Sequence, residues 1–88
     1  MLRITIATRP EGSTLVLEGR LSGPWVAEVS ASCCRLLATC GARAIRIDLN
    51  GVTSMDAAGK ALIRAMYDRG ATVVATELMM HTIVEEKR

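Results

Sequence analysis

The chain has 88 residues, half of them hydrophobic, and a formal net charge of +2. This length suits one domain over residues 1–88, with an aliphatic core because Trp25 and Tyr67 are the only aromatic residues. Scattered arginines without stacking aromatics argue against nucleic-acid binding, and no apolar run approaches the roughly 20 residues of a membrane span. The chain start lacks the apolar segment of a signal peptide, and an odd number of cysteines argues against a secreted disulfide framework, so we expect a cytoplasmic protein.

A β-hairpin is predicted at the start of the chain. Apolar and polar residues alternate over residues 2–8 and again over residues 14–21, which is the period of a half-buried strand. Pro10 and Gly12 lie between the two runs and supply the backbone angles of a turn. Two antiparallel strands joined by that turn are the simplest interpretation.

A helix is predicted to follow the hairpin. Ser22 or Gly23 can cap it, and Pro24 suits its first position, where the missing N–H costs nothing. Gly41 is the expected C-terminal stop. Apolar side chains recur at three- and four-residue spacing and form one stripe. They are Trp25, Val26, Val29, Cys33, Leu36, Leu37 and Cys40.

The middle of the chain predicts a buried strand, a tight loop and a second helix. Residues 44–49 alternate as a strand does, and Asn50 and Gly51 are expected to break it. Asp56 is an N-cap of the preferred type for a helix over residues 56–69. The residues expected to face the core or permit close approach in that helix are Ala58, Gly59, Leu62, Ile63 and Met66.

The last part predicts one more strand and one more helix. The β-branched run 72–76 indicates a central strand, and residues 78–86 indicate a helix with solvated residues 85–88. Its inward residues are expected to be Leu78, Met79, Thr82 and Ile83. The order β-β-α-β-α-β-α implies crossover connections, and hence an α/β fold with a mixed four-stranded sheet and about three packed helices.

Residues 49–59 read L-N-G-V-T-S-M-D-A-A-G. This run and the element order resemble a STAS domain, the fold named from sulphate transporters and anti-sigma factor antagonists, whose loop reads L-x-G-V-x-x-h-D-S-S-G. Residues 17–21 and 70–74 add supporting matches, so the resemblance covers essentially the whole chain. It implies a STAS-like fold and a bacterial regulatory module whose contact surface is the loop and helix start over residues 50–60.

The resemblance also implies what this chain lacks. In phospho-regulated members, a Ser or Thr follows the Asp and is phosphorylated by a kinase-like anti-sigma factor; a phosphate there suits the helix N-terminus and can repel the partner by its charge. Here Ala57 occupies the phosphoacceptor position, so the usual switch is expected to be absent. Thr53 and Ser54 carry hydroxyls just upstream, although such hydroxyls usually bond to nearby backbone.

The leading prediction is therefore a non-catalytic module that regulates transcription by binding a protein partner, like an anti-sigma factor antagonist. The alternative is an accessory subunit of a lipid transporter, because STAS domains also bind transport ATPases. Neither interpretation predicts membrane insertion, and the oligomeric state stays open. The candidate contact residues are Asn50, Thr53, Ser54, Met55, Asp56, Ala57 and Lys60.

Several candidate residues also have a purely structural interpretation. Asp56 can act as a cap first and as a partner contact second. Asp48 can pair with Arg46 or Arg43. Lys60 lies in the first turn of the second helix, where a cation opposes the helix dipole; it is either solvated or in contact with an anionic group.

Metal binding and catalysis lack the residue patterns they need. Cys33 and Cys40 lie seven apart on one helix face and belong to the core, whereas Cys34 points elsewhere. With His81 as the only histidine, tetrahedral zinc spacing is absent, and we expect no metal and no cofactor. Without a Ser-His-Asp set, a phosphate-binding glycine loop or a dinucleotide fingerprint, we expect no enzyme.

Overall fold

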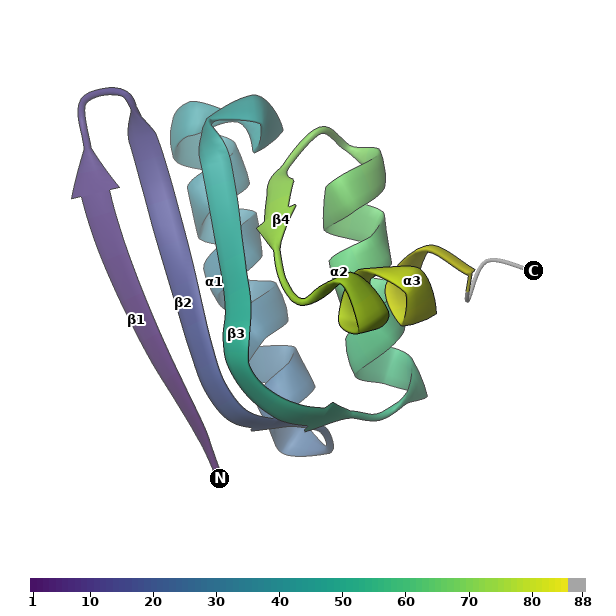
Figure 1. Cartoon of the computed structure of the whole chain (residues 1–88). Coiled ribbons are helices and arrows are strands. Elements are labelled where there is room, and N and C mark those ends of the chain that lie inside the picture. Colours follow the sequence, from purple (N-terminus) through teal and green to yellow (C-terminus); the bar gives the residue numbers. More distant parts are fainter. Residues whose placement is uncertain (86–88) are drawn as a thin grey trace.

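The computed structural model describes residues 1–85, with side chains up to residue 83, and shows a sheet backed by helices (Figure 1). In chain order the elements are β1 (Leu2–Arg9), β2 (Gly12–Leu21), α1 (Pro24–Cys40), the 3-10 helix η1 (Ala42–Ala44), β3 (Ile45–Met55), α2 (Ala57–Asp68), β4 (Thr72–Val74) and α3 (Glu77–Glu85). The predicted order and the mixed four-stranded sheet are thus confirmed. The predicted solvation of residues 85–88 concerns side chains outside the described part of the chain.

The sheet has the strand order β1-β2-β3-β4. β1 pairs antiparallel with β2 and confirms the hairpin, whereas β2–β3 and β3–β4 are parallel pairs joined by α1 and α2. β1 is therefore one edge of the sheet. β4 is the other, which corrects the prediction of a central strand. Only Thr72–Val74 pair with β3, because the chain then turns away into α3.

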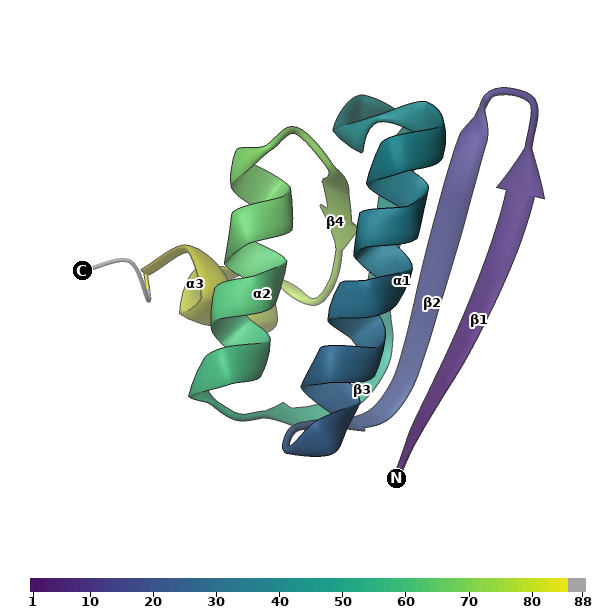
Figure 2. The same ribbon diagram turned by 180° about the vertical axis from the view of Figure 1, so that it is seen from behind.

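Helices α1 and α2 cover one face of the sheet, as the view from behind shows (Figure 2). Alternate residues of β2 and β3 point into this layer and are buried, whereas their neighbours face the side that no helix of residues 1–85 covers. The side chains with no exposed surface in these strands are Leu15, Leu17, Leu21, Ile47 and Leu49. This alternation explains why the two strands were visible in the sequence as period-two patterns.

The core between the layers is aliphatic, as the composition predicts. The apolar stripe of α1 is confirmed: Val29, Cys33 and Leu36 are buried, and the remaining members are partly buried against them. Gly41 ends the helix, and its N–H donates to the carbonyl of Leu37. In α2, Ile63 and Met66 are buried and Leu62 is partly buried, but Ala58 is exposed, which corrects its predicted place against the core.

The tight loop predicted after Leu49 is wrong. β3 continues through Asn50 and Gly51 to Met55, in register with β2 apart from two shifts in the pairing. Gly51 belongs to the strand because β2 passes close to it: a Cβ there would lie 2.7 Å from Cγ of Glu18. Glycine acts here as a point of close approach and not as a strand breaker.

The orientation predicted for the last helix is only partly right. Ile83 is buried and Met79 and Thr82 are partly buried, but Leu78 is 78% exposed. α3 packs beside α2 at the end of the sheet and has few neighbours to cover it (Figure 1). An apolar side chain that sequence periodicity assigned to the core therefore lies on the surface.

Candidate functional site

The two parallel strands β2 and β3 end side by side and enter α1 and α2. Leu21 is the register partner of Met55, so the two helices begin next to each other. The backbone N–H of Asp56 donates to the carbonyl of Leu21 over 3.2 Å and fixes this junction. Gly59 then packs directly against it, since a Cβ on Gly59 would lie 2.6 Å from the same carbonyl oxygen.

The carboxylate of Asp56 is bound by both helix starts. Its Oδ1 accepts a hydrogen bond from the N–H of Gly59 over 2.8 Å, which confirms the predicted N-cap of α2. Its Oδ2 accepts from the N–H of Gly23 over 3.0 Å, at the N-cap position of α1. One side chain therefore accepts hydrogen bonds from donors at two helix N-termini. The bond from Gly23 joins residues that are 33 apart in the chain, and the sequence did not predict it.

These hydrogen bonds hold Asp56 in its ionised form. The N–H of Gly23, and next that of Gly59, lower the pKa of the Asp56 carboxyl below its ordinary value, while desolvation acts in the opposite direction. The negative charge sits where two helix dipoles present their positive ends. The donors that would bind an external anion at this point are thus already taken by the chain's own carboxylate.

The predicted phosphoacceptor position lies at the first turn of α2. Ala57 and Ala58 are both exposed there and offer only methyl groups to a partner. Just upstream, the hydroxyl of Thr53 donates to the carbonyl of Gly19 over 3.3 Å, so it links β3 to β2. Ser54 is exposed on the same strand.

Met55 and Lys60 lie beside α3. They line a shallow hollow of about 220 Å³ together with Thr76, Leu78, Met79 and Thr82. Sequence reasoning named Met55 and Lys60 as contact residues but missed the contribution of α3. The sequence carried no signal of this contribution, because the exposure of Leu78 becomes apparent only once α3 is placed against α2.

Asn50 does not join this group. It lies six residues before Asp56 on an extended strand, which corresponds to roughly 20 Å at the rise of a β-strand. Its N–H donates to Oδ1 of Asp48 over 2.9 Å. Within the described residues, Asp48 has this partner and no ion pair to Arg43 or Arg46, so the proposed pairing is not present.

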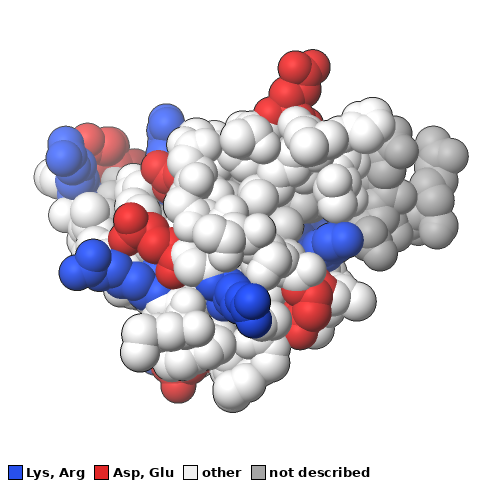
Figure 3. Space-filling view, turned by 60° about the horizontal axis from the view of Figure 1, so that its bottom comes forward, with Lys and Arg blue, Asp and Glu red and all other residues white. Residues whose placement is uncertain are grey.

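The face that presents the helix starts carries both signs of charge. Figure 3 shows lysine and arginine side chains interspersed with aspartate and glutamate, separated by uncharged surface. A surface that mixes both signs lacks the gathered basic residues of a nucleic-acid site.

The described residues offer little for other chemistry. No group of three His, Cys, Asp or Glu side chains among them is placed to hold a metal ion. Burial, with a contribution from Cys34, raises the pKa of the Cys33 thiol to about 11, so this sulfur stays protonated and unreactive at neutral pH. None of the helices in this part of the chain has the length and apolar character to cross a membrane.

Solved structures share this fold. An anti-sigma factor antagonist from Mycobacterium paratuberculosis is 17% identical, with a TM-score of 0.78 over 99% of this chain and 81% of that chain. The anti-sigma factor antagonist SpoIIAA, in its unphosphorylated form, is 16% identical, with a TM-score of 0.69 over 93% of this chain and 80% of that chain. Part of a protein named Mglu is 21% identical, with a TM-score of 0.62 over 83% of this chain and 19% of that chain.

These similarities show that the chain has a STAS-like fold. No protein-family model matches the sequence, and no curated protein does.

Proposed function

We propose that the chain is a non-catalytic, cytoplasmic regulatory module that binds an anti-sigma factor, since two proteins with the same fold are named anti-sigma factor antagonists. The contact is made by a helix-start surface formed by Met55, Ala57, Ala58, Lys60 and Leu78. The observation that carries this proposal is the exposed apolar group of Leu78 and the alanines beside the fixed start of α2.

The helix-start surface has the composition of a protein contact. Leu78 is 78% exposed, and the hollow it lines with Met55 and Met79 is mainly apolar. Flexible methionine side chains adapt to a partner's shape, and a large exposed apolar side chain gains free energy when a partner covers it. Asp56 acts beneath this surface as a positioning residue, because it fixes both helix starts.

The module works without a phosphate switch at Ala57. A methyl group in the first turn of α2 leaves the surface uncharged at that point, which is the state compatible with binding. The regulatory variable is then the amount of the protein in the cell and not its modification.

The direct test measures binding of the purified chain to the anti-sigma factors encoded in the same genome. Leu78→Asp and Ala57→Asp should each weaken the dissociation constant at least about tenfold, because each places a charge in the contact. Aspartate in the first turn of a helix is favourable for the dipole, so Ala57→Asp should leave folding intact. Ala31→Asp, on the exposed side of α1, is the matched control and should bind like the unmodified chain.

Two results would contradict the proposal. One is that none of these anti-sigma factors binds. The other is that all three variants bind one of them equally well, which would keep the function but move the contact elsewhere. Binding to the ATPase of a transporter in place of an anti-sigma factor would favour the alternative function as a transporter subunit. Asp56→Lys is a poor probe of the surface, since it also removes the tie between the helices.

A further inference from the structure

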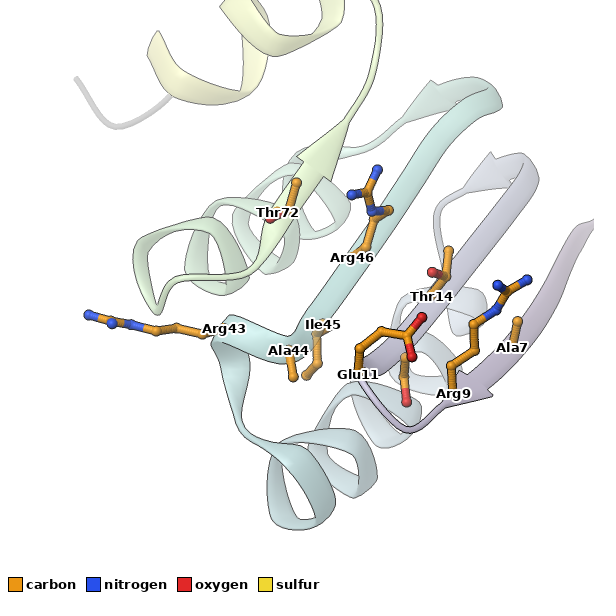
Figure 4. A pocket seen from close by; sticks show the side chains of 11 residues that line it. Ala7, Arg9, Glu11, Thr14, Arg43, Ala44, Ile45, Arg46 and Thr72 are labelled. Atoms are coloured by element: carbon orange, nitrogen blue, oxygen red, sulfur yellow. The ribbon is translucent and has the colours of Figure 1, made fainter.

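A second hollow lies at the opposite end of the parallel strands, where β2 and β3 begin. It has a volume of about 520 Å³ and opens on the sheet face that carries no helix of the described part of the chain (Figure 4). Nine strand residues separate Ile45, at this end of β3, from Met55 at the helix-start surface. The two sites are therefore independent, and the inference below does not rest on the proposed function.

The hollow exists because small residues form its floor. Ala7, Thr14, Arg46 and Thr72 are consecutive register partners, one from each strand, and form a row across the sheet. Beyond this row, Gly12 lies against Ala44, where a Cβ on Gly12 would collide with the Ala44 carbonyl oxygen. The glycine, the two alanines and the two threonines have short side chains or none, so the sheet surface lies lower there than at the long side chains of Arg9, Glu11 and Arg46.

The walls of the hollow are charged. Arg9, Glu11 and Arg46 project from β1, from the hairpin turn and from β3 respectively, while Arg43 extends away from them (Figure 4). Among the side chains of residues 1–83, neither Arg9 nor Arg46 has a hydrogen bond or ion pair to another side chain. Two guanidinium groups and one carboxylate leave the hollow with a net charge of +1 from these three residues.

This arrangement fits a particular kind of ligand. The planar guanidinium group binds the oxygens of phosphate or carboxylate through paired N–H donors. Glu11 accepts hydrogen bonds and would repel a bare anion, so it favours a ligand that also brings a donor. The volume falls within the range of roughly 300 to 1,000 Å³ of small-molecule sites. No aromatic side chain lines the hollow, so a stacked base has no platform there.

We propose that this hollow binds a small molecule that carries an oxyanion group, phosphate or carboxylate, together with a hydroxyl or ammonium group. Arg9 and Arg46 hold the oxyanion, Glu11 accepts from the donor group, and Thr14 and Thr72 add hydroxyl groups along the row between the strands. The residues come from separate strands, so the site depends on the folded sheet.

The test is a titration followed by amide chemical shifts, with inorganic phosphate, phosphoethanolamine, ribose 5-phosphate and succinate as probes. Saturable shifts at Gly12, Thr14 and Arg46, with a dissociation constant of about 1 mM or tighter, are expected for at least one probe. The probes also distinguish the two kinds of oxyanion. Stronger binding of the phosphate compounds would identify the ligand's oxyanion as phosphate, and stronger binding of succinate would identify it as carboxylate.

Matched variants decide whether the arginines are responsible. The double variant Arg9→Gln, Arg46→Gln should weaken binding at least about tenfold, while Arg69→Gln, which removes an exposed arginine at the end of α2, should not change it. Glu11→Gln should reduce the preference for phosphoethanolamine over phosphate. The proposal is overturned if no probe saturates at these amides, or if the double variant binds as well as Arg69→Gln.

Discussion

The starts of α1 and α2 lie side by side but are stabilised in different ways. α2 has a cap from its own sequence, because Asp56 directly precedes it and accepts from Gly59. The N-cap of α1 is Gly23, which has no capping side chain; its N–H donates to the carboxylate of Asp56, 33 residues away. One helix start is therefore a local property of the chain, and the other exists only in the folded molecule.

The largest expected effect comes from separating the two helix starts. Gly59→Ala places a methyl group 2.6 Å from the carbonyl oxygen of Leu21, which is backbone and cannot move aside easily. We expect a loss of about 1 to 3 kcal/mol in the free energy of unfolding, measured by denaturant titration. The exposed neighbour offers the control Ala58→Ser, which should stay within about 0.5 kcal/mol. A Gly59→Ala protein as stable as this control would show that the junction has room.

The next effect separates the two hydrogen bonds of Asp56. Asp56→Ala removes both and should lower the Tm by roughly 5 to 10 °C. Asp56→Asn keeps a good cap for α2, but its amide group meets the N–H of Gly23 as a second donor, so the decrease should be smaller and should come from α1. Amide hydrogen exchange at Gly23 should speed up in both variants, and at Gly59 only in Asp56→Ala. Equal exchange at Gly59 in both would contradict this division.

The pH dependence of stability sharpens the same comparison. The pKa of Asp56 is lowered in the folded state, so its contribution is fully present above the ordinary value of about 4 and is lost as the pH falls through the folded-state pKa. The stability difference between the unmodified protein and Asp56→Asn should therefore be full at pH 7 and shrink in acid below about pH 4. A difference that stays constant down to pH 2 would mean that the charge of Asp56 does not contribute.

The smallest effect on the fold concerns the residue after the cap. Ala57→Ser, at an exposed position in the first turn of α2, should change the free energy of unfolding by less than about 0.5 kcal/mol. It would nevertheless place a hydroxyl directly after Asp56. A cognate anti-sigma kinase should transfer phosphate to this variant and not to the unmodified chain. Transfer to Thr53 or Ser54 of the unmodified chain would refute the absence of a switch.

Local patterns in the sequence predicted most of the fold. The hairpin, the apolar stripe of α1, the cap at Asp56 and the stop at Gly41 each follow from residues close together in the chain, and each is present. Their physical basis is local as well: side-chain periodicity, capping and the backbone freedom of glycine.

The sequence-based predictions were wrong where contacts between distant parts of the chain determine the local structure. Asn50 and Gly51 read as a strand end, but pairing with β2 keeps them in β3. The run after Gly70 reads as central because it is β-branched, yet it lies at the sheet edge. Leu78 has the periodicity of a core residue, yet no element of residues 1–85 covers it. For the candidate site, the sequence identified Met55, Asp56 and the following turn, but not the bond to Gly23 or the contribution of α3.

The position of β1 at the sheet edge has a consequence for self-association. Its outer backbone groups are open to pairing with another strand, which is the usual route to edge-to-edge aggregation. An antiparallel pair of two β1 strands centred on Ile6 would set Arg3 opposite Arg9 of the second copy, twice, on the same face. Like charges directly opposite each other are destabilising in such pairs. The arginines at the two ends of β1 thus act as gatekeepers that disfavour this dimer, and Arg9 serves the hollow as well.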